Sequence, residues 1–271
     1  MFGRLRYYWG IGWHYLRLAI QAQMEYPAFL AGWLITNPMQ VLVGVLTIYF
    51  TVQNFGSLGG WSFAELAFLL GIASVSHGIS VMLFIQTWYI KWMALEGEFD
   101  RLLVRPLNVF FQFCLHDFNL IGITDFLPGL AVLIWGCQLT GFSPDPFNII
   151  KLLAAVAGAV LIRGAVFLGC GSIPLYAQGA NSMEDLNMKL FSYTSQYPLS
   201  IYPRALQAIF TFVLPLGFIS FYPASEFLGK QTAFLLPGGL WLGSLLTGAA
   251  LFAVAYVVFH YGLKRYSSAG S

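Results

Sequence analysis

"LLAAVAGAVLIRGAVFLGCG", residues 152–171, decides how this chain folds, because the whole run carries a single charge, that of Arg163. A helix needs about 20 predominantly apolar residues to cross the hydrocarbon core of a bilayer. In lipid every backbone polar group must be satisfied internally, and the run lacks the period-two alternation of a barrel strand. We therefore predict that it forms a membrane-spanning helix.

The composition of the whole chain agrees with this prediction. Hydrophobic residues make up 58% and charged residues 9% of the 271 residues, whereas a soluble domain of that length still needs a polar shell. The net charge of +2 is small and no basic run is interleaved with aromatic residues, so nucleic acid is not an expected partner. The sequence thus predicts an integral membrane protein whose main solvent is lipid.

Six segments are long and apolar enough to be spans, and they predict an all-α integral membrane protein with six transmembrane helices. The segments are 27–53, 63–90, 113–140, 149–177, 203–222 and 238–262. Residues 1–25 mix tryptophans and tyrosines with arginines at helical spacing, which is typical of an amphipathic helix lying in the membrane interface. We expect residues 26–266 to form one transmembrane domain, followed by a short cytoplasmic tail, 267–271.

Positive charges predict the orientation of these spans. Basic residues concentrate on the side that holds both termini and the connections 91–112 and 178–202, which the positive-inside rule identifies as cytoplasmic. The opposite side carries only Lys151 and Lys230. The basic residues counted on the cytoplasmic side are Arg4, Arg6, Arg17, Lys91, Arg101, Arg105, Lys189, Arg204, Lys264 and Arg265.

The connection between the second and third spans, "EGEFDRLLVRPLN" (96–108), is unusually rich in charge. Gly97 can break the preceding helix, and Asp100 suits the N-cap or the first turn of a new one. Pro106 disfavours helical geometry at Arg105 and ends the helix. The pattern indicates a short amphipathic helix over about 96–106. A solvated loop that only fixes topology through its charges is the alternative.

A second helix is predicted in the cytoplasmic connection before the fifth span. Ser182 and Asp185 have the spacing of a capping box, which favours a helix over about 183–194. Two tyrosine–proline pairs, at 197–198 and 202–203, then interrupt the chain.

Two stretches carry a resemblance to a known family. "GEFDRLLVRPLN" (97–108) together with "YPLSIYPRALQAIFTFVLPLGFISFYPA" (197–224) resembles the membrane subunits of bacterial ABC exporters of the ABC-2 type, and most closely the branch of multidrug and viologen exporters. The resemblance extends over essentially the full length of the chain. It implies an exporter permease of the bacterial inner membrane that moves a hydrophobic or cationic small molecule, or a lipid-like substrate, by alternating access.

The resemblance also implies partners and site residues. Residues 96–106 would be a coupling helix in a groove of a cytoplasmic ABC ATPase dimer, with Phe99, Leu102 and Leu103 as its apolar anchors. A second permease subunit, identical or related, would complete the pathway, and segment 223–237 would be a re-entrant segment on the outer side. The residues assigned to the ATPase contact are Glu98, Phe99, Asp100, Arg101, Leu102, Leu103, Arg105 and Pro106.

The chain itself is expected to have no enzymatic role and no cofactor. It contains no GxxxxGK[ST] phosphate-binding loop, so ATP and Mg²⁺ would be bound by the partner ATPase. A rival hypothesis is an integral-membrane enzyme or an assembly subunit of a lipid pathway. An enzyme of that kind would need clustered acids, bases or metal ligands near one interface.

Two ionisable residues, Asp125 and Arg163, lie within predicted spans. A lone charge at the centre of a spanning helix costs roughly 2.5–3.5 kcal/mol, so we expect the two side chains to share a site. Their pairing is either structural or part of the transport pathway, and the sequence leaves both readings open.

Overall fold

The computed structural model describes residues 2–116, 118–177, 191, 197–232 and 236–266, and the regular elements among them are helical. The α-helices are α1 (Phe2–Met24), α2 (Pro27–Phe55), α3 (Phe63–Phe84), α4 (Ile90–Leu95), α5 (Glu98–Leu103), α6 (Val109–His116), α7 (Ile121–Thr140), α8 (Pro146–Gly171), α9 (Ile173–Tyr176), α11 (Arg204–Ala208), α12 (Phe221–Phe227) and α13 (Leu240–Arg265). The tighter or wider turns are η1 (Ile85–Tyr89), η2 (Leu199–Ile201), η3 (Ile209–Val213) and η4 (Leu216–Phe218).

Five stretches in the described part of the chain are long and apolar enough to cross a membrane. They are Pro27–Phe55, Phe63–Leu95, Ile121–Thr140, Pro146–Tyr176 and Leu240–Arg265. These stretches coincide with five of the six predicted spans. The third begins later than predicted, because the chain turns after α6 and restarts where Asn119 Oδ1 accepts a hydrogen bond from the backbone N–H of Ile121 at 2.8 Å.

The predicted fifth span, 203–222, is not a continuous helix. It consists of α11, the π-helical turn η3, a break at Leu214–Pro215, the 3₁₀ turn η4 and the first residues of α12. Proline has no N–H to donate and pushes the residue before it out of the helical region, and Leu214 accordingly has φ −118° and ψ 89°. The predicted boundary between a span and a re-entrant segment at 222/223 therefore falls inside α12.

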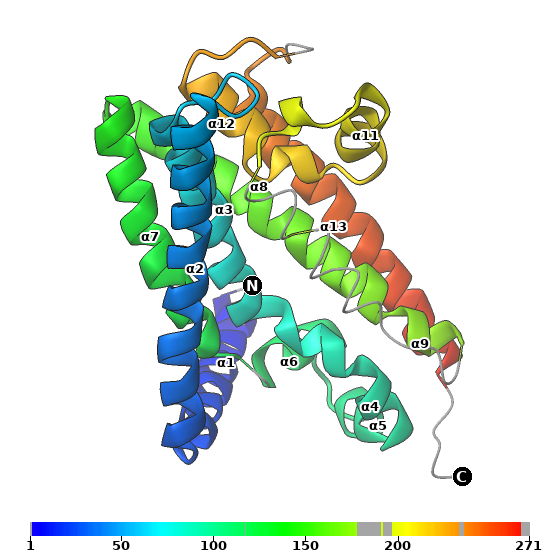
Figure 1. Cartoon of the computed structure of the whole chain (residues 1–271). Helices are drawn as coiled ribbons and strands as arrows, with labels where there is room; N and C mark the ends of the chain where they lie inside the picture. Colours follow the sequence, from blue (N-terminus) through cyan, green and yellow to red (C-terminus); the bar gives the residue numbers. More distant parts are fainter. Residues whose placement is uncertain (1, 117, 178–190, 192–196, 233–235, 267–271) are drawn as a thin grey trace.

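Hydrogen bonds and an ion pair show which elements lie at each of the two ends of the helix bundle (Figure 1). One end, called here the α5 end, holds α5, α9 and the C-terminal part of α13, where the Tyr176 hydroxyl donates to Val258 O at 2.5 Å. The other end, called the α12 end, holds the turn between α2 and α3. There the Ser200 hydroxyl donates to Gly59 O at 3.2 Å, and Lys230 Nζ lies 2.8 Å from Glu65 Oε2.

These contacts correct the predicted topology of the connection 178–202. The described chain leaves the α5 end at Tyr176 and is at the α12 end by Ser200, so the connection does not return to the side from which it started. Arg204 begins α11, which lies at the α12 end in Figure 1, so it is not on the side predicted for it. The predicted cytoplasmic helix 183–194 lies outside the described residues except for Phe191.

Phe191 contradicts the cytoplasmic assignment at its own position. Its ring packs edge-on against Phe167 of α8, with 5.4 Å between ring centroids. Phe191 is also only 5% exposed, and its ring centroid lies 4.7 Å from the guanidinium carbon of Arg163, near the middle of the stretch Pro146–Tyr176. Phe191 therefore sits within the bundle.

Two pairs of helices pack at backbone distance. A Cβ added to Gly78 of α3 would lie 2.5 Å from the backbone nitrogen of Phe126 in α7, so these two helices tolerate no side chain there. In the second pair, a Cβ on Gly158 of α8 would lie 2.4 Å from the carbonyl carbon of Ser244 in α13. Figure 1 shows α8 and α13 running side by side, and α8 also packs against α3, where a Cβ added to Gly164 would lie 2.5 Å from the ring of Phe84.

The arrangement predicts which residues share a side of the membrane. With the three native cysteines replaced by alanine, Ser200→Cys and Lys230→Cys should react with an impermeant thiol reagent from the same side, and Glu98→Cys only from the other. Equal labelling of Ser200→Cys and Glu98→Cys in sealed vesicles of one orientation would contradict the two-ended assignment.

Candidate functional site

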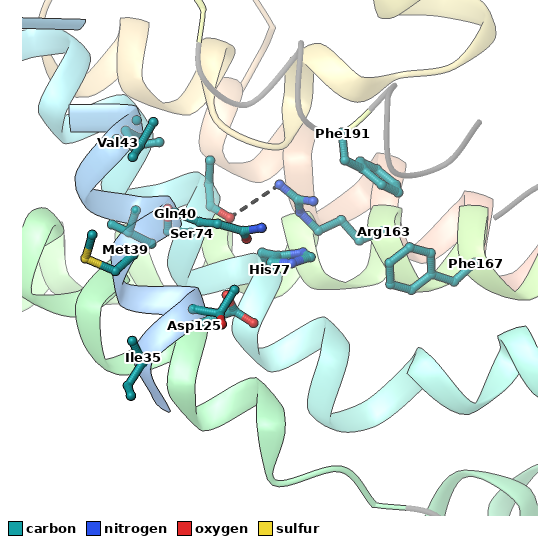
Figure 2. Close-up of a pocket in the computed structure, with 15 residues that line it drawn as sticks. Ile35, Met39, Gln40, Val43, Ser74, His77, Asp125, Arg163, Phe167 and Phe191 are labelled. Atoms are coloured by element: carbon teal, nitrogen blue, oxygen red, sulfur yellow. Dashed lines mark hydrogen bonds between the residues drawn. The ribbon is translucent and has the colours of Figure 1, made fainter. Parts of the chain in front are cut away.

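A cavity of about 660 Å³ lies between the two groups of helices. Its walls come from α2, α3, α7, α8 and Phe191, and Figure 2 shows the side chains that point into it. The lining residues are Ile35, Thr36, Met39, Gln40, Val41, Val43, Gly44, Leu70, Ala73, Ser74, His77, Asp125, Arg163, Phe167 and Phe191. An apolar cavity with a few convergent polar groups is the usual form of a ligand site.

One polar wall is built by α2 and α7 around Asp125, which is 8% exposed. Asn37 donates through Nδ2 to Asp125 Oδ2 at 2.9 Å and to Thr124 Oγ1 at 2.8 Å. A buried carboxylate needs hydrogen bonds to offset its lost hydration, and Asn37 supplies one from a neighbouring helix. This contact fixes the position of α2 against α7 at the depth of the cavity.

The opposite wall is built by α8 around Arg163, which is 1% exposed. Arg163 Nη2 donates to the carbonyl oxygen of Ala73 in α3 at 3.3 Å, and the guanidinium carbon lies 4.7 Å from the ring centroid of Phe191. A backbone carbonyl and an aromatic face both stabilise a buried cation. Arg163 thereby bridges the two helix groups.

Asp125 and Arg163 both line the cavity; the hydrogen bonds described for them go to other residues, and their charges interact across the cavity. Figure 2 shows the two side chains on different sides of the cavity, with His77 lying between them in this view. A direct ion pair between them stays a prediction. Both charged side chains line the same cavity, so neither is enclosed entirely by packed protein atoms.

The second candidate region is the segment around α5. It begins at Gly97, whose φ of +73° is left-handed and separates α4 from α5, as the sequence predicted. Glu98 and Asp100 occupy the first turn of α5 and Arg101 the last, which suits the helix dipole. The helix ends at Leu103, so it is shorter than the predicted range of 96–106.

Two of the three predicted anchors of α5 point into the helix bundle of this chain. Phe99 is 0% and Leu102 is 4% exposed, and both belong to an apolar cluster with residues of α6, α8, α9 and α13. Phe99 stacks on Phe113 at 6.2 Å and meets Tyr266 edge-on at 5.7 Å. The expectation that Leu102 fills a groove on a partner is therefore wrong, because its side chain is already buried.

The outer face of α5 carries different apolar residues. Leu103 is 46% and Val104 is 86% exposed, beside the exposed charges of Glu98 and Arg101. Just beyond them Arg105 hydrogen-bonds through Nη1 to the Tyr15 hydroxyl of α1. This face combines charge with exposed apolar surface.

Hydrogen bonds hold the segment against the bundle. Buried Gln112 of α6 donates through Nε2 to Leu102 O at 3.1 Å and to Leu107 O at 3.2 Å. Asn108 donates to the Tyr256 hydroxyl of α13 at 2.9 Å. The α5 segment is thus tied to α6 and α13 on both sides of exposed Pro106.

Sequence reasoning missed four residues that organise these two regions: Asn37, His77, Gln112 and Phe191. Asn37 directly precedes Pro38 within an apolar run, so its position inside a predicted span is a signal that could have been used. His77 has no His, Cys, Asp or Glu three or four residues away, so its spacing gives no sign of a metal site. Gln112 and Phe191 carry no distinctive local pattern.

Comparison with known proteins adds a family assignment for most of the chain. Residues 38–270 match the family model described as "ABC-2 family transporter protein". The curated proteins and the solved structures contain no match to this chain.

The geometry of the cavity predicts which polar residues are energetically coupled. In a double-mutant cycle, Asn37→Ala and Asp125→Ala should be non-additive by roughly 1 kcal/mol, because removal of either partner already breaks their buried hydrogen bond. Thermal unfolding of the protein in lipid nanodiscs would measure the coupling. Strict additivity would show that the Asn37–Asp125 contact contributes nothing to stability.

Proposed function

The chain belongs to the ABC-2 family of transporter proteins, and we propose that it is the permease subunit of an ATP-driven exporter in the bacterial inner membrane. It is a multi-pass membrane protein and the membrane subunit of an ABC transporter, which works with an ABC ATPase. We infer that its substrate is a hydrophobic or cationic small molecule, or a lipid-like molecule, moved outwards by alternating access. ATP hydrolysis belongs to the partner.

The charge distribution supports a cytoplasmic location for the α5 end and for both termini. Arg101 and Arg105 lie on the α5 segment, and Lys264 and Arg265 end α13 at the same end. Moving Arg204 to the α12 end leaves this excess of basic residues in place. Under the positive-inside rule the α5 end faces the cytoplasm.

The proposed ATPase contact rests on one observation: one face of α5 is buried in the chain and the other is exposed. Phe99 and Leu102 anchor the helix in the permease, while Leu103, Val104 and Arg101 are presented outwards. A short helix held rigidly on one face, with mixed apolar and charged groups on the other, suits a mechanical contact with a soluble partner. On this proposal the charges of the α5 segment contact the ATPase in addition to setting the orientation of the chain in the membrane.

The same anchor offers a route for force into the membrane helices. The cluster that buries Phe99 includes Leu168 of α8 and Phe259 of α13, which are the two members of one closely packed helix pair. We propose that displacement of α5 by the ATPase moves α8 and α13 together relative to α2, α3 and α7. Because the cavity lies between these groups, that motion would change access to it.

A second permease subunit fits the open side of the cavity. The α2 residues that line it, among them Ile35 and Met39, are 69% and 53% exposed. We propose that a second copy of this chain, or a related permease, faces this side and that the two subunits enclose the pathway.

Substitutions on the two faces of α5 should have different effects. Leu103→Asp combined with Val104→Asp should leave the melting temperature of the permease unchanged but reduce co-purification with its ATPase at least about tenfold, since charge replaces the exposed apolar contact. Leu102→Asp should instead destabilise the permease itself, because it buries a carboxylate in an apolar cluster.

Charge reversal provides a matched control for this experiment. Arg101→Glu should weaken the same association, whereas Arg17→Glu, which changes another exposed arginine near the same end, should not. Normal ATPase binding and transport by the Leu103/Val104 double variant would reduce the segment to a topological loop.

A further inference from the structure

We propose that the cavity between α2, α3, α7 and α8 binds a zwitterionic amphiphile, with its cationic group at Asp125 and its anionic group at Arg163. This inference rests on the proposed transport function and names the substrate class of the site. It follows from three properties of the cavity: its mixed charge, its arrangement of hydrogen-bonding groups, and its opening along an apolar helix face.

The cavity has an acidic side chain, Asp125, on one wall and a basic side chain, Arg163, on another. Asp125 and Arg163 are both buried, where charge–charge interactions are strong. A ligand with a single charge would be attracted by one of them and repelled by the other. A zwitterion can match both charges at once. It also enters the low-dielectric site without adding net charge.

The anionic wall is suited to an ammonium group. Asp125 Oδ2 accepts a hydrogen bond from Asn37, and among the described contacts Oδ1 accepts none. An ammonium near this carboxylate would form a charge-assisted interaction with an oxygen that Asn37 leaves available.

The cationic wall is suited to a phosphate or carboxylate group. The guanidinium of Arg163 is held by Ala73 O and by the ring of Phe191, so its charge is fixed in place. His77 also lines the cavity, and Figure 2 shows it between the two charged groups. Its imidazole offers a hydrogen-bonding group to the middle of a dipolar head group.

The apolar part of the ligand is indicated by the α2 wall. Ile35, Met39 and Val43 line the cavity and are 69%, 53% and 56% exposed, so the polar site is continuous with an apolar surface outside the bundle. A hydrocarbon chain would lie along this surface, between α2 and the second subunit proposed above, while the head group occupies the cavity. The cavity volume of about 660 Å³ is in the range of sites for drug-sized ligands.

Binding of three dodecyl amphiphiles with the same tail would test the inference. Radiolabelled dodecylphosphocholine, dodecyltrimethylammonium and dodecyl phosphate would be offered, below their micellar concentrations, to the full chain in lipid nanodiscs, with binding to empty nanodiscs subtracted. The zwitterionic probe should bind about tenfold more tightly than either singly charged probe, the difference expected from one charge-assisted contact.

Charge-removing variants should change the order of preference, which a merely misfolded protein would not do. Asp125→Asn should favour dodecyl phosphate, and Arg163→Gln should favour dodecyltrimethylammonium. Asp145→Asn, at the exposed N-cap of α8, makes the same chemical change away from the cavity and should keep the wild-type order, because asparagine caps helices as well as aspartate.

Two outcomes would overturn the inference: tighter binding of a singly charged probe by the wild-type chain, or an unchanged order in both cavity variants. Either could occur while the chain still associates with its ATPase through α5. Loss of that association would count against the proposed function and not against the ligand class.

Discussion

The close approach of α3 and α7 is the constraint on which the rest of the structure depends. Glycines at 71 and 78 of α3 and at 122, 129 and 136 of α7 recur every seven residues, and an added Cβ at each would meet the facing helix at 2.7 Å or less. In lipid, where no hydrophobic force drives helices together, such close packing supplies the dispersion contacts that do. Because the two backbones touch, α3 and α7 behave as one body, and α2 is attached to it through Asn37 and Asp125.

A second body forms in the same way from α8 and α13, and the function follows from how the two bodies meet. Arg163 reaches across to Ala73 beside a polar cavity, while other side chains of α3 and α8 pack in one apolar core. Phe99 and Leu102 of α5 lie in an apolar cluster that joins α4 and α6 to α8, α9 and α13. We propose that a push on α5 would reach α8 and α13 through this cluster and would so change one side of the cavity, as alternating access requires.

The sequence was sufficient for much of this fold and for part of the site. Long apolar runs predicted five of the spanning stretches, Gly97 marked the start of α5, and the rarity of charge within spans pointed to Asp125 and Arg163. The course of residues 197–227 could not be predicted, because hydropathy does not distinguish an apolar segment facing lipid from one covered by protein. Residues 216–225 are buried within the chain itself, and Pro215 separates them from α11. The role of Leu102 was missed for a related reason: a six-residue helix has two faces, and the sequence does not say which of them the permease covers.

Distances between spin labels would test most directly whether two rigid bodies flank the cavity. Labels at exposed Leu139 of α7 and Leu246 of α13 give a distance between the two bodies. Labels at exposed Leu153 of α8 and Leu246 give a distance within the α8–α13 pair. Pulsed electron paramagnetic resonance on the complex with its ATPase would compare nucleotide-free and ATP-bound states. The account predicts that ATP shifts the Leu139–Leu246 distance and leaves the Leu153–Leu246 distance unchanged. A shift within the α8–α13 pair, or no shift between the bodies, would contradict it.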